Sequence, residues 1–414
     1  MRLKIKKTNY LFGEIQISGS KNASLPILTT TLLTKEKIHL HNVPNILDVE
    51  YMIELLKHIG VKVIRNLTTN EVILKRKKLK TNIKSPYLNQ IRASYYLMGA
   101  LFTEKKCIKT KNPGGCNFEK RPIDYHLDAF KQMGASINIS NEDIVIKRKK
   151  KLPINITLQK KSLGTTINII LSTVKTKGTT IIKNPSLEPE VLDFITILKK
   201  MQANIKIVNN EIIIKGVKKL VGTTHKIIPD RIEAGSYLCL AASCEKSNLL
   251  LTNLNKNHLT KVIETFKNSG LNILNEGESI RIIKNKQLSN MKIIADDYPN
   301  FPTDLQQLMV STLLNTKGLS IVKDLIYPRR FSEVFELLSM NASLYLRENC
   351  LLVSPSKLIG KTVFAADLRA GFSLIIAGAC ADGETIINHS EVILRGYENL
   401  IEKLRAINVE IDII

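Results

Sequence analysis

A cysteine lies in a polar, glycine-rich segment that reads NPGGCNFEKRPIDYH from Asn112 to His126. Two glycines directly precede Cys116, and Arg121 follows five residues later. A structural cysteine prefers apolar neighbours, whereas a flexible approach and nearby positive charge favour a reactive thiol. We therefore predict a chemical role for Cys116.

A second polar segment, Gly19–Ala23 (GSKNA), follows the strand-like run GEIQIS and precedes the helical run LPILTTTLL. Backbone N–H groups at the start of a helix favour anions, and Lys21 adds a full positive charge. The glycine and lysine spacing of a P-loop is missing. An anion site fits these residues, and so does a structural arrangement in which Ser18 or Ser20 caps the helix and Lys21 is solvated.

Arginine is scarce, with 14 residues among the 61 basic ones, so each arginine in a polar loop is informative. A guanidinium group binds carboxylate or phosphate in a bidentate way that lysine cannot reproduce. Arginines gathered from both halves of the chain would suit a small substrate that carries both anions. The alternative is that each arginine caps a helix or pairs with a surface acid. The arginines in such loops are Arg92, Arg121, Arg330, Arg369 and Arg395.

Two aspartates precede apolar helical runs, Asp304 in DDYPNFPTDLQQL and Asp367 in ADLRAGFS. Each has a structural interpretation as a helix N-cap. The functional interpretations are a carboxylate base for Asp304 and a group that orients Arg369 for Asp367. The seven histidines show no HExxH or other ligand spacing, so we expect neither a metal nor a cofactor.

Length and composition fit a cytosolic protein of two or three domains, with 414 residues, 44% hydrophobic and 24% charged. No apolar run reaches about 18 residues and the N-terminus lacks an apolar signal core, so we expect no membrane span and no signal peptide. The six cysteines form no CxxC pair and are expected to be reduced. The net charge of +24 comes from lysine spread along the whole chain, so we expect neither a nucleic-acid nor a membrane partner.

These candidate residues lie on a chain that repeats itself six times. Each repeat has the pattern of an amphipathic helix, a turn residue and a strand, as in IELLKHIGVKV ending at Val63. The turn positions recur at intervals of about 70 residues, which is typical of an internal repeat. They are residues 60, 134, 202, 270, 341 and 408.

Further strand-like runs make each repeat a mixed α/β module, and six modules divide as three plus three. We predict one three-repeat domain over residues 21–228, which carries the Cys116 loop. Residues 229–414 form the other; the first strand, in residues 1–20, precedes the first full repeat and is free to pair with this domain. A cleft between two such domains is a usual ligand site, and we expect the active site there.

The segments SGSKNASLP, PGGC with RPIDYH, PNFPTDLQ, YPRRF, DLRAGFS and RGYENL resemble, in this order, motifs of UDP-N-acetylglucosamine enolpyruvyl transferases of bacterial cell-wall synthesis. The resemblance runs from about residue 5 to the C-terminus. It implies an α/β fold of two domains, each of three βαβαββ-type repeats in pseudo-threefold arrangement, called an inside-out α/β barrel. It also implies that residues 1–20 join the domain of residues 229–414. EPSP synthase shares this fold but lacks the cysteine loop and usually has Ser in place of Asn22.

The resemblance implies transfer of enolpyruvyl from phosphoenolpyruvate to the 3-hydroxyl of UDP-N-acetylglucosamine, with release of phosphate. This addition–elimination is the first committed step of peptidoglycan synthesis. Cys116 matches the general acid that protonates the methylene carbon, and Asp304 matches the candidate base. The family's cations around the carboxylate and the leaving phosphate match Lys21, Arg121 and Arg395, with Arg330 and Arg369 nearby.

The resemblance also implies which residues contact the substrates. The sugar nucleotide is expected to contact Asn22, Arg92, Arg121, Pro122, Ile123, Asp124, Tyr125, Lys160, Lys161, Ser162, Leu163, Gly164 and Ile326. The remaining expected substrate contacts are Lys21, Asp304, Arg330, Asp367, Arg369 and Arg395. A cysteine at position 116 further implies sensitivity to the epoxide antibiotic fosfomycin.

Three residues depart from the family pattern. Leu394 stands where an aspartate often precedes the arginine of the RGY motif, and Pro328 and Arg329 replace an acidic residue and an asparagine. These changes concern groups that position the site and leave every named catalytic group in place. The alternative functions are a shikimate-type enolpyruvyl transferase and, less favoured, a basic nucleic-acid-binding protein. The sequence leaves the oligomeric state open, with a monomer expected.

Overall fold

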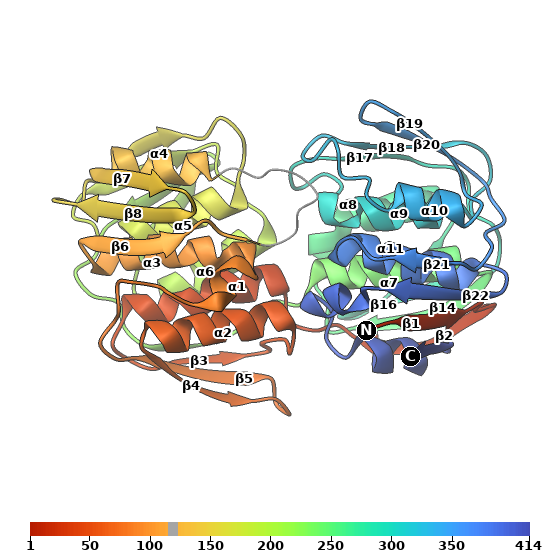
Figure 1. Cartoon of the computed structure of the whole chain (residues 1–414), viewed down its shortest axis with the longest axis horizontal. Helices are drawn as coiled ribbons and strands as arrows, with labels where there is room; N and C mark the ends of the chain where they lie inside the picture. Colours follow the sequence, from red (N-terminus) through yellow and green to blue (C-terminus); the bar gives the residue numbers. More distant parts are fainter. Residues whose placement is uncertain (115–122) are drawn as a thin grey trace. The chain divides into compact units, whose positions relative to one another are not determined.

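The computed structural model describes residues 1–114 and 123–414, which form two compact units (Figure 1). Among the described residues, unit 1 comprises residues 1–18 and 229–414, and unit 2 comprises residues 19–114 and 123–228. The chain thus leaves unit 1 after Ser18 and returns to it at Pro229. Each unit has its own hydrophobic core, as expected of a separate domain.

The three sheets of unit 2 share one strand pattern, in which a parallel pair is extended by antiparallel strands. The third sheet has an isolated parallel bridge, Asn82 with Lys109, in place of its parallel strand. The strand orders are β13 (Thr223–Lys226), β3 (Ile38–His41), β5 (Glu71–Arg76), β4 (Val61–Asn66); β9 (Asn155–Thr157), β10 (Thr179–Lys183), β12 (Glu211–Lys215), β11 (Asn204–Val208); and β6 (Cys107–Lys111), β8 (Asp143–Arg148), β7 (Ala135–Ser140).

The sheets of unit 1 repeat this pattern and incorporate the start of the chain. β2 pairs in parallel with β14, and Leu3 of β1 lies opposite Ile387 of β22. The strand orders are β2 (Tyr10–Gln16), β14 (Lys246–Thr252), β16 (Ser279–Lys284), β15 (Asn272–Glu276); β17 (Lys292–Ala295), β18 (Ser320–Asp324), β20 (Cys350–Ser354), β19 (Ser343–Arg347); and β21 (Thr362–Phe364), β22 (Glu384–Asn388), β1 (Leu3–Lys6), β23 (Ile411–Ile413).

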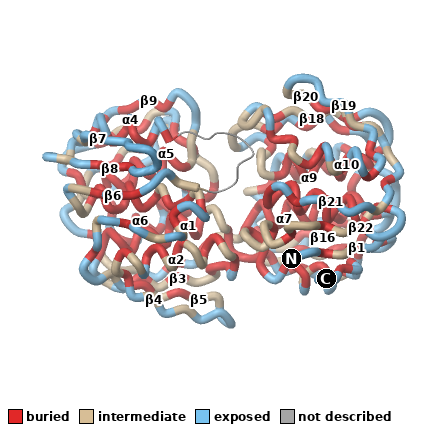
Figure 2. The backbone as a smooth tube through the Cα atoms, viewed as in Figure 1, coloured by how far each residue is buried: buried red, intermediate tan, exposed pale blue. Residues whose placement is uncertain are grey.

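Three buried helices pack together inside each unit. Most of their residues are apolar or small, and every residue of α7 is buried, which is typical of helices without a solvent face. The buried stretches in Figure 2 include these helices. They are α1 (Lys21–Thr29), α3 (Tyr96–Glu104) and α5 (Leu163–Thr173) in unit 2, and α7 (Arg231–Ser243), α9 (Gln306–Leu313) and α11 (Leu368–Cys380) in unit 1.

Six further helices each run into a strand through one left-handed residue, so the predicted sixfold repeat is confirmed. The residues at the six predicted turns are Gly60, Gly134, Gln202, Gly270, Asn341 and Asn408, and all have φ between 67° and 112°. Glycine and asparagine adopt this conformation at the least cost, which explains five of the six. The helices are α2 (Leu47–Ile59), α4 (Asp124–Gln132), α6 (Pro189–Lys200), α8 (Thr260–Asn268), α10 (Val334–Ser339) and α12 (Leu400–Ala406).

The predicted mixed α/β fold is confirmed. The sheets of the described residues are open, with three or four strands each, and none closes on itself into a barrel. No helix within residues 1–114 and 123–414 combines the length and the apolar character that crossing a membrane requires. Short 3-10 helices complete the order: η1 (Thr30–Leu33), η2 (Pro86–Asn89), η3 (Arg92–Tyr95), η4 (Lys256–Leu259), η5 (Thr303–Leu305) and η6 (Ser390–Arg395).

Candidate active site

The loop with the predicted thiol lies outside the described residues. Cys116, Arg121 and Pro122 therefore have no structural description. The other predicted site residues lie in both units and are described unit by unit.

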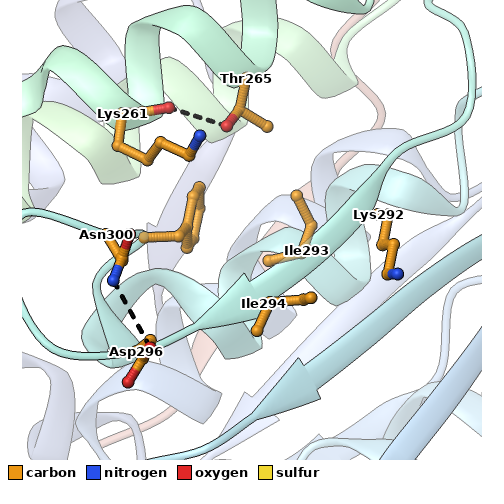
Figure 3. Close-up of a pocket in the computed structure, with 8 residues that line it drawn as sticks. Lys261, Thr265, Lys292, Ile293, Ile294, Asp296 and Asn300 are labelled. Atoms are coloured by element: carbon orange, nitrogen blue, oxygen red, sulfur yellow. Dashed lines mark hydrogen bonds between the residues drawn. The ribbon is translucent and has the colours of Figure 1, made fainter.

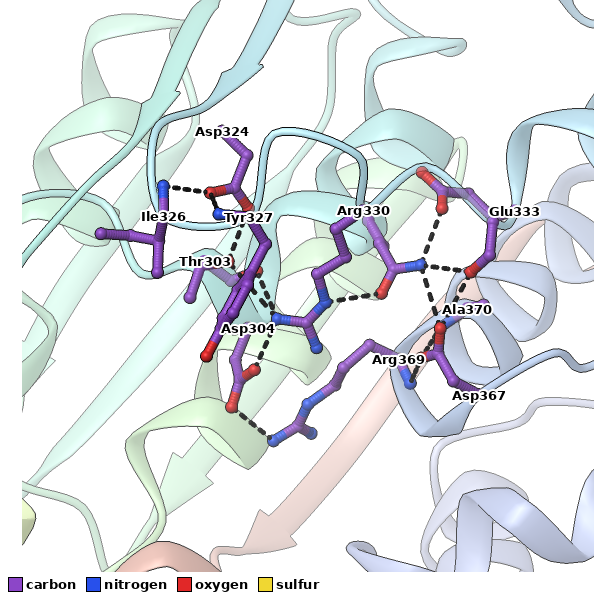
Figure 4. A network of polar contacts seen from close by, with 12 residues as sticks. Thr303, Asp304, Asp324, Ile326, Tyr327, Arg330, Glu333, Asp367, Arg369 and Ala370 are labelled. Carbon is purple, nitrogen blue, oxygen red and sulfur yellow. Dashed lines mark hydrogen bonds and ion pairs between the residues drawn. The ribbon is translucent and has the colours of Figure 1, made fainter. Parts of the chain in front are cut away.

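In unit 1, Asp304 lies between two arginines from distant parts of the chain (Figure 4). Its Oδ1 accepts a hydrogen bond from Nη1 of Arg330 at 2.8 Å, and its Oδ2 lies 3.4 Å from Nη2 of Arg369. Asp304 belongs to η5, whose N-cap is Pro302, so the structural interpretation of Asp304 as an N-cap is wrong. Its carboxylate instead joins three chain segments through charge-assisted hydrogen bonds.

Both arginines are buried, with side-chain exposures of 6% for Arg330 and 5% for Arg369, against 27% for Asp304. Burial opposes the charge of Arg330, but the carboxylates of Asp304 and Asp367 outweigh it and raise the pKa of Arg330. The pKa of Arg369 is also raised, because Tyr397 and Asp304 counteract its burial. Asp304 is the partly exposed member of the trio, and so the one that a ligand from solvent can reach.

Gln307 connects this trio to a second layer of polar groups. Its Oε1 accepts a hydrogen bond from Nε of Arg330 at 3.2 Å, which leaves its Nε2 as a donor. That Nε2 donates to Glu333 at 2.8 Å, and it lies 3.4 Å from Oδ2 of Asp367. Asp367 in turn caps α11 by accepting from the N–H groups of Arg369 and Ala370. The predicted capping role of Asp367 is therefore confirmed, and it fixes the backbone of Arg369.

Two further contacts fix the arginine side chains. Nη1 of Arg369 donates to the hydroxyl of Tyr397 at 2.9 Å, and that hydroxyl lies 2.7 Å from Ser236. Burial raises the pKa of Tyr397 to about 12, despite the adjacent guanidinium, so the phenol is neutral near pH 7. The guanidinium of Arg330 lies over the ring of Tyr327 at 5.8 Å. Both arginines are thus preorganised before any ligand binds.

The loop that carries Ile326 is shaped by Asp324. Oδ1 of Asp324 accepts from the N–H groups of Ile326 and Tyr327, both at 2.8 Å, and its Oδ2 accepts from Thr303 at 2.5 Å. Because Thr303 directly precedes Asp304, this carboxylate links the predicted sugar-nucleotide contact at Ile326 to the Asp304 segment. Asp324 was not predicted from the sequence.

Arg395 and the three departures from the family pattern lie near this group in the chain. Arg395 ends η6, is partly buried, and stands two residues before Tyr397. Leu394 is partly buried against the core of unit 1, so the departure at this position gains apolar packing. Pro328 and Arg329 lie in the turn that leads to Arg330, whose N–H donates to the carbonyl of Tyr327 at 3.0 Å.

In unit 2, Lys21 begins α1 and pairs with Asp48 at 2.7 Å. Ser20 caps the helix, with its hydroxyl accepting from the N–H of Ala23, as the structural interpretation predicted. The prediction that a structural Lys21 would be solvated is wrong, because only 13% of its side chain is exposed. Asn22 follows it and is partly buried.

Arg92 lies beside a buried histidine of the same unit. Its guanidinium is 6.0 Å from the ring centre of Tyr95, and that ring is 4.6 Å from the ring of His126. Nδ1 of His126 lies 2.8 Å from the side-chain amide of Asn168 on α5. Burial and the charge of Arg92 lower the pKa of His126 to about 3, so His126 is neutral at physiological pH.

The predicted segments 123–125 and 160–164 start the two helices next to Arg92. Ile123 is the N-cap of α4, with Asp124 and Tyr125 in its first turn. Ser162 caps α5, and a Cβ on Gly164 would lie 2.5 Å from the hydroxyl of Tyr95, so a larger residue there would require Tyr95 to move. Lys160, Lys161 and Tyr125 are exposed, and Leu163 is partly buried. The structure thus joins the Arg92 and Gly164 segments through one tyrosine.

Several of these residues, in both units, share one feature: they lie at or just before the N-termini of the buried helices. Backbone N–H groups and the helix dipole make this end favourable for anions. In order, these positions hold Lys21 (α1), Arg92 (before α3), Ser162 to Gly164 (α5), Arg231 (α7), Asp304 (before α9) and Arg369 (α11). Arg231, whose guanidinium lies over Tyr298 at 5.5 Å, was missed from the sequence although it stands at the equivalent repeat position.

A separate hollow of about 350 Å³ in unit 1 lies between α8 and β17 (Figure 3). It is lined by residues that include Lys261, Lys292, Asp296 and Phe301, none of them predicted for the site. Phe301 stands three residues before Asp304, so the hollow adjoins the same loop. The Asp304 network itself does not line it.

Comparisons with known proteins identify the family. A sequence model described as EPSP synthase (3-phosphoshikimate 1-carboxyvinyltransferase) matches residues 5–404. The chain belongs to the EPSP synthase family. Within that family, it is 39% identical to a protein of Wolbachia sp. subsp. Brugia malayi over 98% of both chains, and 38% identical to one of Halothermothrix orenii over 98% of both. It is 40% identical to a Staphylococcus aureus relative over 99% of this chain and 98% of that one.

The names of these relatives confirm the resemblance seen in the motifs. The first two are named UDP-N-acetylglucosamine 1-carboxyvinyltransferase, and the third carries the same name with the number 2. Solved structures of enolpyruvyl transferases agree in fold. The enolpyruvyl transferase NikO of Streptomyces tendae matches with a TM-score of 0.91 at 19% identity, over 99% of this chain and 98% of that one. An EPSP synthase of Acinetobacter baumannii matches with 0.76 at 19% identity, over 100% of both.

The buried carboxyl of Glu333, which accepts a hydrogen bond from Gln307, makes the stability of the fold depend on pH. Burial raises its pKa to about 8, although Gln307 donates to it. Between its ordinary pKa near 4.5 and about 8, the folded state holds a proton that the unfolded chain releases, so the free energy of unfolding falls as pH rises. We expect the Glu333→Gln variant to lose this decrease in the free energy of unfolding. The decrease amounts to a few kcal/mol, because each unit of pKa shift corresponds to about 1.4 kcal/mol.

Urea unfolding of both proteins at pH 5.5, 7 and 8.5 measures this effect. Glu402→Gln, at an exposed position on α12, serves as the matched control and should behave as the wild type. Parallel stability profiles for the wild type and Glu333→Gln would contradict the prediction of a protonated Glu333.

Proposed function

We propose that this chain transfers the enolpyruvyl group of phosphoenolpyruvate to the 3-hydroxyl of UDP-N-acetylglucosamine and releases phosphate. The observation that carries the proposal is the identity of 38–40% over nearly the whole chain to relatives with that activity in their name. The EPSP synthase structures are only 18–19% identical, which favours the sugar nucleotide over a shikimate acceptor. The buried arginine pair around Asp304 supports chemistry on an anionic substrate.

The proposed reaction is an addition followed by an elimination. The sugar oxygen attacks C2 of phosphoenolpyruvate while a proton is added to C3, which becomes a methyl group. Loss of a proton from that methyl group and departure of phosphate restore the double bond. We assign Cys116 as the acid that protonates C3 and Asp304 as the candidate base for the sugar hydroxyl. To accept that proton, Asp304 must loosen at least one of its contacts with Arg330 and Arg369.

The reaction needs positive groups to balance the charges of the carboxylate and of the departing phosphate. We assign Lys21, Arg121 and Arg395 to the carboxylate and the leaving phosphate, with Arg330 and Arg369 holding Asp304 in place. A cation that is fixed in advance stabilises a developing anion without reorganisation, and this effect contributes more to catalysis than any other in many enzymes. The salt bridge from Asp48 supports this role for Lys21, because it restrains the lysine next to the start of α1.

We propose that the sugar nucleotide binds to Asn22, Arg92 and the segments 121–125 and 160–164, and also contacts Ile326. Tyr95 supports this assignment, because its ring lies 6.0 Å from the guanidinium of Arg92 and its hydroxyl packs against Gly164 at the start of α5. The exposed side chains of Lys160, Lys161 and Tyr125 are available to a diphosphate and a base. A reaction of this kind would take place in the cytoplasm and provide a precursor for the bacterial cell wall. Cell shape and cell division depend on that wall.

The first test of the proposed function is phosphate release from the full-length protein. We expect release only when phosphoenolpyruvate and UDP-N-acetylglucosamine are both present, and none when shikimate-3-phosphate replaces the sugar nucleotide. Cys116→Ser should lose most of the activity, and fosfomycin should inactivate the wild type. Release with shikimate-3-phosphate alone as acceptor would support the alternative transferase, and no release with either acceptor would refute both.

A second test concerns Asp304. We expect Asp304→Asn to lower kcat by roughly 10²–10⁴-fold, as removal of a general base usually does. Asp382→Asn is the matched control, because Asp382 forms a surface salt bridge with Lys7 at 2.7 Å. Steady-state kinetics with both substrates measures the effect. An Asp304→Asn enzyme that keeps wild-type kcat would remove the proposed base.

A further inference from the structure

Two histidines and a glutamate meet on the sheet of unit 2 that contains β3 and β5. His39 and His41 are separated by one residue on β3, so both side chains lie on the same face. β5 runs antiparallel to β3, with Leu40 opposite Val72, which places Glu71 across from His41. This face is turned away from the core, toward which Leu40 and Val72 point. None of the three residues takes part in the proposed reaction.

The side-chain atoms of the three residues converge on one point. Nδ1 of His41 lies 2.9 Å from Oε1 of Glu71, and Nε2 of His39 lies 3.7 Å from Oε2. The imidazole rings are 4.2 Å apart, and the potential ligand atoms all lie within 4.8 Å of one another. A tetrahedral zinc ion with bonds of about 2.1 Å needs ligands roughly 3.4 Å apart, so small side-chain rotations suffice.

Nε2 of His39 faces Oε2 of Glu71 at 3.7 Å, which is too far for a hydrogen bond. Nε2 of His39 has almost no contact with solvent and no hydrogen-bond partner among the described residues. A buried polar atom without a hydrogen bond is costly, and it calls for an explanation such as a functional role, an ordered water or a bound ion. We propose that His39, His41 and Glu71 bind one divalent transition-metal ion of the zinc class, with water in the remaining position. Two imidazoles and one carboxylate form an established zinc ligand set.

The charges around the cluster determine which kind of metal ion can bind there. Lys226 of β13 is the register neighbour of His41, and it belongs to the same exposed face. Asn66 of β4 lies opposite Glu71 on the other side. With a lysine beside it and a chain charge of +24, the site cannot collect cations by long-range attraction. Binding must come from direct ligation, so a metal that prefers nitrogen ligands is expected and Mg²⁺ is not.

Metal titration of the chelator-treated, full-length protein tests the proposal. We expect calorimetry to show one Zn²⁺ bound per chain, and His39→Ala, His41→Ala and Glu71→Gln each to weaken binding at least about tenfold. His58→Ala, which removes a histidine of α2 in the same unit, should bind as the wild type. His39→Gln and His41→Gln keep the side-chain size, and far-UV circular dichroism without metal checks that every variant is folded.

Co²⁺ distinguishes this cluster from the cysteines. Binding through histidine and carboxylate gives only weak visible bands, whereas a thiolate ligand adds an intense charge-transfer band. Weak bands that disappear in His41→Ala support the proposal. An intense thiolate band that persists in His41→Ala would assign the metal to a cysteine and overturn it. Absence of saturable Zn²⁺ binding would leave a hydrogen-bonded histidine–glutamate pair and also overturn it.

Discussion

Arg330 and Arg369 are almost entirely removed from water, so their charges must be balanced inside unit 1. The desolvation of a guanidinium group costs several kcal/mol unless carboxylates and hydrogen bonds compensate for it. Asp304 supplies the central charge, and Gln307, Asp367 and Tyr397 fix the geometry. Segments that are far apart in the chain must therefore fold together correctly before this cluster can form. The same contacts hold the carboxylate of Asp304 in a fixed position while part of its side chain stays exposed.

The sixfold repeat explains why chemically useful residues gather at a few places. Each repeat contributes one buried helix, and a buried helix must satisfy the free N–H groups of its first turn. Ser20, Ser162, Asp230 and Asp367 do so by capping α1, α5, α7 and α11. The same helix ends attract anions, so a residue placed there serves both folding and ligand binding. Lys21 and Arg369 occupy such first-turn positions.

Much of the fold was accessible from the sequence because its signals are local. The helix, turn and strand of each repeat follow from apolar spacing, and Gly60 or Asn408 marks its turn directly. The motifs also led to Asp304, Arg330 and Arg369. What could not be predicted depends on partners from other segments. Nothing near Asp48 indicates a salt bridge with Lys21, and the preference of aspartate for N-caps suggested the wrong role for Asp304. The cluster of His39, His41 and Glu71 arises from strand pairing, which histidine spacing alone does not reveal.

In the proposed reaction, phosphoenolpyruvate passes through an intermediate whose C3 is a methyl group, formed with Cys116 as acid and Asp304 as base. Running the reaction with UDP-N-acetylglucosamine in D₂O and analysing the product by NMR tests it directly. Addition followed by elimination predicts deuterium in the methylene group of the product. A product formed at a normal rate with no deuterium there would contradict the mechanism, and with it the roles assigned to Cys116 and Asp304.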